Sequence, residues 1–380
     1  MGLLAVACII AGVRFDRRVT VLMLILLMWN MGGLMSLINV VGREKTVQYA
    51  ATSIYLAIAA LMWACILAEN TMPRMSALRS AYILSAVLAA VAGILGYFNI
   101  GGLEELFAPG GRAMGAFKDP NVYAPFLIWP ALVLMQRMLV HRLRLVDLGA
   151  FGLIVVALLL AFSRGAWFHF ALSGAIMIAL SFLTARRAST RTRIFFMSAV
   201  AFAAMVAFVV FLLSIPAIHQ MFEVRAQLIQ PYDVGQGGRF RLQEIAITSV
   251  LKHMNGLGPF GFSTAHGSQQ HNVYLQAFLV YGWLGGVTYI LLVLATFWAA
   301  LRTVFVTSPW QSYAIIALAV FTGEVAESFI IDSDHWRHFF LILGMVWGLW
   351  AATDRYRKQL HAALTAPGFV PAPAWQATWG

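Results

Sequence analysis

Charged residues are scarce in this sequence, and their scarcity excludes a soluble fold. Asp, Glu, Lys and Arg make up 11% of the 380 residues, whereas hydrophobic residues make up 61%. Soluble domains usually carry about 25% charged residues. Several apolar runs reach the length of about 18 residues that is typical of a membrane-spanning helix. They do not alternate as the ~10-residue strands of a membrane β-barrel do, so we expect an all-α, polytopic membrane helix bundle.

Cysteine is scarce as well. Cys8 and Cys65 both lie in apolar runs, which favours neither a disulfide framework nor a thiolate metal site. We expect no cleavable signal peptide, because the first positive charge, Arg14, follows the first apolar run instead of preceding it. The segment "DSDHWRH", residues 332–338, offers metal-ligating side chains without a standard spacing. We therefore expect a polar hairpin there and no metal.

The apolar runs predict eleven spans and one long loop. The predicted spans are 1–13, 19–41, 46–68, 78–98, 120–140, 146–162, 165–185, 194–216, 271–301, 310–331 and 337–353. They divide the chain into eight spans in residues 1–216, a large loop at 217–270 with a helix near 239–254, three spans in residues 271–353, and a Pro/Ala-rich tail at 354–380 that we expect to be disordered.

Lys and Arg are distributed unevenly between alternate loops. One set of loops holds sixteen of the 26 basic residues and four of the 15 acidic ones, and the other set holds ten basic and eleven acidic residues. The positive-inside rule places the first set in the cytoplasm. The large loop and the C-terminal tail are then expected on the outer and the cytoplasmic face, respectively. The net charge of +11 is a consequence of this topology, so no nucleic-acid partner is indicated.

Two of the outer stretches carry arginines at the ends of spans. In "GGRAMGAFKDPNVYAPF", which starts at residue 110, Arg112 precedes Asp119 and Asn121 at the start of a predicted helix. Asp119 is a candidate N-cap, whereas Arg112 lies on the side where topology does not favour arginine. In "SRGAW", residues 163–167, Arg164 lies between two spans with almost no loop. It either snorkels to lipid headgroups or serves a functional site at a buried span end.

The third stretch, "GGRFRLQEIAITSVLKHMNGLGPFGF", begins at residue 237 and predicts an amphipathic helix. Arg239 lies in its first turn, where backbone N–H groups and the helix dipole favour an anion. Arg241 lies two residues further on and therefore points away from Arg239. A local partner at i+3, Glu244, gives Arg241 a structural role. We therefore favour Arg239 as the ligand-binding arginine.

The fourth stretch, "HNVYLQAFLVYGWLGG", places His271 and Asn272 at the mouth of a span. A histidine at such an interface is often only a polar anchor, yet imidazole suits proton transfer near neutral pH. Glu324 and Glu327 lie at i, i+3 in the outer half of the tenth predicted span. Acids at membrane depth are functional candidates. They are either counter-ions to the outer arginines or part of a proton or cation path.

In chain order, these four stretches together resemble the O-antigen ligase and O-antigen polymerase (Wzy-C type) superfamily over roughly residues 80–350. The resemblance implies a bacterial inner-membrane glycosyltransferase with a GT-C-like fold and one large periplasmic loop. It implies transfer of a glycan from undecaprenyl diphosphate to an acceptor hydroxyl, either on another glycan or on lipid A-core, without a metal or cofactor. Membrane lipids are the remaining expected partner.

The resemblance also implies roles for individual residues. His271 matches the family's essential histidine, Arg164 and Arg239 match the arginines that hold the diphosphate, and Arg112 is a looser match. Asn121, Asn272, Arg241, Glu324 and Glu327 are possible supporting residues. Gln243 and Val280 differ from residues common in the family, and the sequence resembles exopolysaccharide polymerases at least as well as ligases.

A transporter or flippase of lipid-linked glycans is the alternative function. Transporters usually carry polar or broken segments near the bilayer midplane and often contain internal repeats. Here the polar residues cluster towards the outer ends of the spans, and no repeat is visible in the sequence. Glu324 and Glu327 are the features that favour transport.

Overall fold

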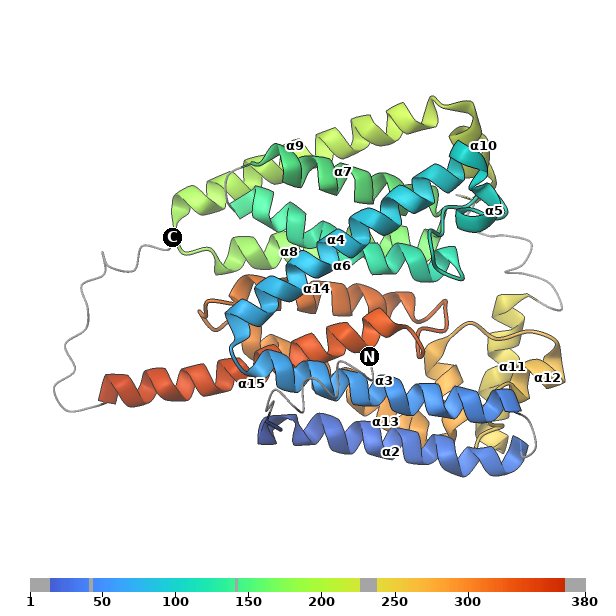
Figure 1. The fold of residues 1–380 in the computed structure, drawn as a ribbon. Helices are drawn as coiled ribbons and strands as arrows, with labels where there is room; N and C mark the ends of the chain where they lie inside the picture. Colours follow the sequence, from blue (N-terminus) through green and yellow to red (C-terminus); the bar gives the residue numbers. More distant parts are fainter. Residues whose placement is uncertain (1–13, 41–43, 141–142, 226–237, 366–380) are drawn as a thin grey trace.

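The computed structural model describes residues 14–40, 44–140, 143–225 and 238–365, and in this part of the chain every regular element is a helix. The predicted first span, 1–13, lies outside the described residues. The long helices lie roughly side by side (Figure 1). The helices are α2 (Thr20–Ser36), α3 (Glu44–Ala68), α4 (Thr71–Tyr97), α5 (Glu104–Phe107), α6 (Pro120–Val140), α7 (Leu145–Leu160), α8 (Arg164–Thr184), α9 (Ala188–Leu213), α10 (Pro216–Arg225), α11 (Arg239–Lys252), α12 (Gly261–His266), α13 (Val273–Val304), α14 (Gln311–Glu327) and α15 (Arg337–Thr365), with short 3-10 turns at Arg17–Val19, Leu37–Val40 and Ile100–Gly102.

Each of the ten predicted spans that the structure describes coincides with one long helix. Seven helical segments in the described residues are long and apolar enough to cross a membrane. Helix α7, with 16 residues, α14, with 17, and α15 are not among the seven. The all-helical fold and the multi-pass membrane character are thus confirmed, whereas the number of eleven spans stays a prediction. Helix α15 continues to Thr365, so residues 354–365 are helical rather than disordered as predicted.

The helices form two packed groups that meet along α14. In one group α15 packs on α3 and α13 packs on α2, and in the other α6 and α4 both pack on α7. Helix α14 joins the groups because it packs on α8 as well as on α13 and α15. The burial of the helices follows this arrangement. Most of the apolar segment of α6 is buried inside the protein, whereas almost none of the apolar segment of α9 is buried. Helix α9 therefore presents nearly its whole apolar surface outward, as a lipid-facing helix does.

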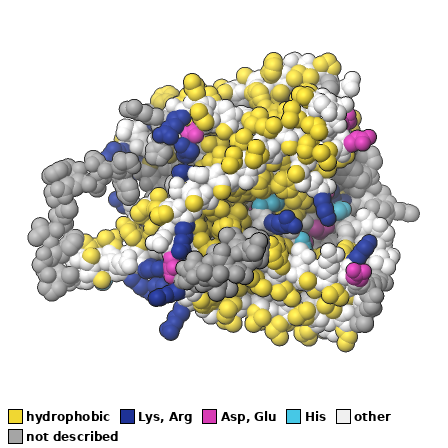
Figure 2. All heavy atoms as spheres, viewed as in Figure 1, with side chains coloured by type: hydrophobic (Ala, Val, Ile, Leu, Met, Phe, Trp, Pro, Cys, Tyr) yellow, Lys and Arg dark blue, Asp and Glu magenta, His cyan; other side chains and the backbone are white. Residues whose placement is uncertain are grey.

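Helices α6, α8, α13 and α15 all begin at one end of the bundle, which we call the cavity end. Polar side chains at the opposite end are joined in ion pairs between distant segments. Arg18 Nε lies 2.7 Å from Asp354 Oδ2, and Arg355 Nη2 lies 2.9 Å from Asp16 Oδ2. Figure 2 shows Lys and Arg side chains gathered at this opposite end, at the left of the view. These ion pairs connect the 3-10 turn at Arg17–Val19 to α15.

Helix α11 lies across the cavity end, and a break in α13 holds it there. The helix α13 is interrupted at Gly282, whose φ of 67° is accessible mainly to glycine. The segment that follows α11 fits against this break, with Leu257 N–H donating to Leu279 O and Trp283 N–H donating to Met254 O at 2.9 Å. A Cβ on Gly282 would come within 3.0 Å of the backbone of Met254 and Asn255. The break therefore positions the C-terminal end of α11, the helix that begins at Arg239.

Candidate functional site

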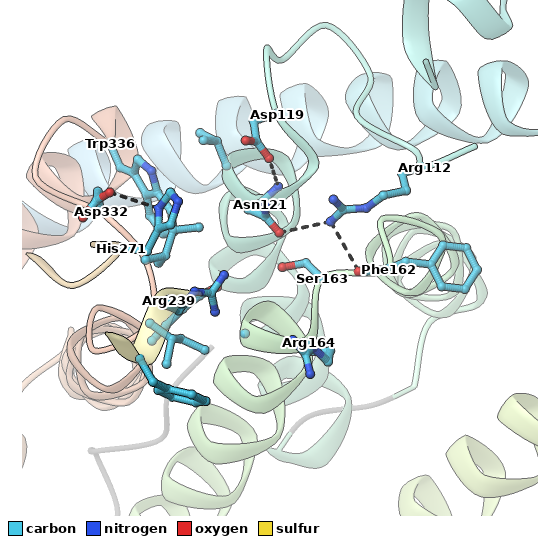
Figure 3. Close-up of a pocket in the computed structure, with 16 residues that line it drawn as sticks. Arg112, Asp119, Asn121, Phe162, Ser163, Arg164, Arg239, His271, Asp332 and Trp336 are labelled. Carbon is cyan, nitrogen blue, oxygen red and sulfur yellow. Dashed lines mark hydrogen bonds and ion pairs between the residues drawn. The ribbon is translucent and has the colours of Figure 1, made fainter. Parts of the chain in front are cut away.

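A cavity of about 580 Å³ opens at the cavity end between the two groups of helices. It is lined by residues from α6, α8, α11 and α14 and by the segments before α6, α8, α13 and α15 (Figure 3). Figure 2 shows basic side chains and histidines near the centre of the molecule, in the space between the two groups. The lining residues are Arg112, Asp119, Asn121, Val122, Phe162, Ser163, Arg164, Gly165, Arg239, Phe240, His271, Glu327, Ile330, Ile331, Asp332 and Trp336.

The structure brings together most of the residues that the sequence singled out. Six of them line this one cavity, although they are spread over more than half of the chain: Arg112, Asn121, Arg164, Arg239, His271 and Glu327. Three others do not line it: Arg241, Asn272 and Glu324. Asp119, proposed as an N-cap, also lines the cavity, and its Oδ1 accepts the backbone N–H of Asn121 at 2.7 Å.

The arginines enter from the first turns of helices. Arg164 and Arg239 are the first residues of α8 and α11, which begin after Ser163 and Gly238. Ser163 Oγ accepts the backbone N–H of Ala166 at 3.5 Å and so caps α8. Backbone N–H groups at a helix N-terminus and the helix dipole both favour anions. Two such termini that each carry an arginine make this part of the cavity suited to a strongly anionic group.

Arg112 donates hydrogen bonds to the backbone of the turn between α7 and α8. Its Nε donates to Ala161 O at 2.9 Å, and its Nη2 donates to Phe162 O at 3.3 Å and to Asn121 Oδ1 at 3.0 Å. Phe162 has a φ of 47°, in the left-handed region. Arg112 thus stabilises the tight turn that precedes Arg164 and links it to the start of α6.

Arg239 and Arg241 differ as the helix geometry predicts. Arg239 lines the cavity and points from α11 towards the turn that carries Ser163 (Figure 3). Arg241 does not line it: its Nη1 lies 2.5 Å from Glu244 Oε2, and both side chains are more than half exposed. Gln243, one turn after Arg239, donates to His271 O at 3.5 Å and to Phe329 O at 3.4 Å. Gln243 therefore connects α11 to the segment that carries His271.

His271 faces the cavity opposite Arg112, with an acidic partner that the sequence did not identify. Its Nδ1 lies 3.2 Å from Asp332 Oδ2 (Figure 3). Burial raises the pKa of the Asp332 carboxyl, and the hydrogen bond and charge of His271 oppose that rise. When Asp332 is ionised it can only accept, so Nδ1 carries the proton and Nε2 is left as the basic nitrogen. His271 remains 43% exposed and can exchange protons with the cavity.

The segment between α14 and α15 is firmly anchored around Asp332. Asp334 accepts a hydrogen bond from Tyr49 Oη on α3, and its Oδ2 lies 3.0 Å from His335 Nδ1. Asn272 caps α13 by accepting Leu275 N–H and donates its own amide to Phe329 O at 3.1 Å. The predicted polar hairpin of residues 332–338 therefore uses its acids and histidines in pairwise contacts. Among the described residues, no group of three or more such side chains could hold a metal ion.

His169 is a second residue that the sequence analysis missed. It is fully buried in α8, and its Nδ1 lies 2.9 Å from Glu327 Oε2 on α14. Glu324, also buried, lies 3.3 Å from His338 Nε2 without the alignment of a hydrogen bond. The two glutamates are therefore matched to histidines of neighbouring helices rather than to the cavity arginines. A single histidine within an apolar run was the only sign of this pairing in the sequence.

Comparison with protein families confirms the resemblance seen in the motifs. Residues 149–290 match the O-antigen ligase family. The match extends from α7 to the middle of α13 and includes Arg164, Arg239 and His271. It indicates glycan transfer of the O-antigen ligase or polymerase type in a multi-pass membrane protein. A comparison with curated proteins gave no match.

The O-antigen ligase match does not cover the whole cavity. Arg112 and Asn121 precede the matched segment, and Glu327 and Asp332 follow it. These flanking residues complete the cavity from α6, α14 and the segment before α15. The partners of His271 and His169 thus come from outside the O-antigen ligase segment.

Proposed function

We propose that this protein transfers or polymerises a glycan from an undecaprenyl-diphosphate donor onto an acceptor hydroxyl, at the periplasmic face of the bacterial inner membrane. The observation that carries the proposal is the meeting of Arg164, Arg239 and His271 in one cavity. The positive-inside distribution of Lys and Arg supports the periplasmic placement of the cavity end.

In this proposal the diphosphate lies against the first turns of α8 and α11. Arg164 and Arg239 compensate the negative charge that grows on the diphosphate as the anomeric C–O bond breaks, which is electrostatic stabilisation of a leaving group. Arg112 keeps the α7–α8 turn in place. The polyprenyl chain then extends along the apolar surfaces between spans.

His271 is the proposed general base. The acceptor hydroxyl attacks the anomeric carbon, and its proton passes to Nε2 of His271, whose Nδ1–H is held by Asp332. The new glycosidic bond forms as the bond to the diphosphate breaks, and the diphosphate leaves with its electron pair. A single displacement of this kind inverts the configuration at the anomeric carbon.

The chain length of lipid-linked glycan in cells that lack this protein tests the proposal. Accumulation of single repeat units on undecaprenyl diphosphate identifies a polymerase, and accumulation of long chains that never reach their acceptor identifies a ligase. A normal glycan profile in these cells would overturn both assignments. Proton-dependent uptake of lipid-linked glycan into vesicles, without transfer, would support the transporter alternative.

A matched pair of arginine variants tests the site itself. We expect Arg239→Gln to lower transfer by about 10²-fold, because charge-stabilising groups of this kind contribute about 10²–10³-fold. Arg241→Gln, two residues away, removes an exposed arginine paired with Glu244 and is expected to retain transfer. Equal losses in both variants, at equal membrane levels, would contradict the placement of the diphosphate.

A further inference from the structure

The inner wall of the cavity contains a buried carboxyl group that the proposed mechanism does not use. Glu327 is 1% exposed and lines the cavity, and it is paired with His169, which is 0% exposed. His169 Nδ1 lies 2.9 Å from Glu327 Oε2, and His169 Nε2 lies 3.0 Å from Val320 O. Both nitrogens of the ring are therefore engaged by oxygen atoms.

These contacts determine where the protons are. A backbone carbonyl only accepts, so Nε2 of His169 carries a hydrogen. One further proton is shared between Nδ1 and Glu327 Oε2, whether the pair is ionic or neutral. A second additional proton would leave a net charge in apolar surroundings, which is costly. In both allowed forms Glu327 Oε1 is a hydrogen-bond acceptor and cannot donate.

Oε1 of Glu327 has no hydrogen-bond partner among the described residues. This buried oxygen lies beside Gly165, where an added Cβ would be 2.8 Å from Oε1. Leaving a buried acceptor without a partner is unfavourable, so this position favours a ligand that donates a hydrogen bond. Gly165 also lines the cavity, next to Arg164 at the first turn of α8.

The geometry points to Glu327 Oε1 as the acceptor for a hydroxyl of the sugar that is attached directly to the diphosphate. This inference rests on the proposed function, which places the diphosphate at Arg164. Gly165 is the next residue, so a group bonded to that diphosphate meets Oε1 first. A sugar hydroxyl is a neutral donor and matches an acceptor in a pair with no net charge. Glu327 is thus a specificity-determining residue rather than a base.

Binding of two lipids separates this contact from the diphosphate site. The probes are undecaprenyl diphosphate and the undecaprenyl-diphosphate-linked glycan purified from cells that lack this protein, and their dissociation constants are measured with the full chain in detergent. Glu327→Met keeps the approximate size of the side chain and removes both of its oxygen atoms. We expect it to weaken binding of the glycan-linked lipid by about tenfold, with binding of the sugar-free lipid unchanged.

Glu324→Met is the matched control, because Glu324 is equally buried on the same helix and does not line the cavity. We expect it to leave both dissociation constants unchanged. Gly165→Ala is a second test that keeps the His169–Glu327 pair and places a methyl group against Oε1. It should lower affinity for the glycan-linked lipid alone, whereas Gly152→Ala, with no atom within 4 Å of the added carbon, should not.

Three results would overturn the inference. Equal weakening of both lipids by Glu327→Met would give Glu327 a general structural role. Unchanged binding of both lipids by the folded Glu327→Met and Gly165→Ala proteins would remove the contact with the sugar while leaving the proposed function intact. Failure of the wild-type protein to bind either lipid would overturn the proposed function and this inference with it.

Discussion

Two histidine–carboxylate pairs face the same cavity and differ in almost every other respect. His271 and Asp332 lie in segments that precede helices, and their side chains are 43% and 20% exposed. His169 and Glu327 lie within helices and are 0% and 1% exposed. His271 has one acidic partner and a second ring nitrogen that is left to act as a base, whereas both nitrogens of His169 are engaged.

The partner of the second ring nitrogen decides the chemistry of such a pair. A histidine that a carboxylate orients from one side can take a proton on the other side. A histidine held between a carboxylate and a carbonyl cannot take up a proton without breaking a buried contact. The first pair is therefore suited to proton transfer, and the second pair is suited to presenting a fixed acceptor.

The largest expected effect contrasts the two histidines. We expect His271→Gln to lower transfer per folded molecule by about 10²–10⁴-fold, because general-base catalysis contributes that much. Its unfolding midpoint in detergent should remain near that of the wild type, since the side chain is partly exposed. His169→Gln should instead lower the unfolding midpoint, because removing one partner of a buried pair costs about 3–5 kcal/mol.

Transfer assays with purified lipid-linked donor, together with thermal unfolding, measure both quantities. Normal transfer by His271→Gln would remove the distinction between the pairs. A large loss of transfer in His169→Gln at full stability would do the same, because the buried histidine would then take part in the reaction.

A smaller effect is expected when the carboxylate of the exposed pair is neutralised. Asp332→Asn removes the charge that stabilises His271 once the ring has taken a proton, and we expect transfer to fall by about 10-fold or more. Asp119→Asn, in the same cavity, keeps a side chain that can cap α6 and should retain transfer. Full transfer by Asp332→Asn would show that Asp332 only supports the backbone.

The smallest effect concerns a third pair, Asp334 and His335, which anchors the segment that carries Asp332. Burial disfavours both charges, but their mutual attraction dominates: it lowers the pKa of Asp334 and raises the pKa of His335. The contribution of His335 to stability is complete below the ordinary histidine pKa and is lost as the pH rises through the raised value. The contribution of Asp334 is present above the ordinary aspartate pKa and is lost as the pH falls through the lowered value.

Stability from this third pair is therefore greatest at mildly acidic pH and declines towards alkaline pH. We expect the unfolding midpoint of the wild type to fall by a few degrees on the alkaline side, and Asp334→Asn to flatten that slope. His253→Gln changes an exposed histidine at the C-terminal end of α11, whose Nδ1 lies 2.9 Å from Ser249 O, and should keep the wild-type slope. A wild-type slope in Asp334→Asn would contradict the role of the pair.

The sequence was sufficient to predict the helices and the grouping of the polar segments. Ten predicted spans coincide with helices, because long apolar runs have few alternatives in a membrane. The first turns at Arg164 and Arg239 could be predicted because capping and helix periodicity are local. The separate roles of Arg239 and Arg241 followed from the angle between adjacent residues of one helix.

The partners of the histidines could not be predicted. Asp332 looked like part of a polar hairpin, and His169 was a single polar residue in an apolar run. Each partner lies at least 60 positions away along the chain, on a helix or segment that only packing brings close. The sequence also did not indicate that residues 354–365 continue α15 as a helix.

Hydrophobic length, charge asymmetry and local capping act over a few turns of the chain. A helical membrane protein with polar side chains gathered at one end could therefore be predicted from the sequence alone. The packing of α14 against α8 arises only in the folded protein, where it gives Glu327 a histidine partner and places its side chain in the lining of the cavity. The physical reason is that pairing between helices depends on shape and small-residue contacts, such as Gly323 against His169 and Ser173, which leave no periodic signal in either helix.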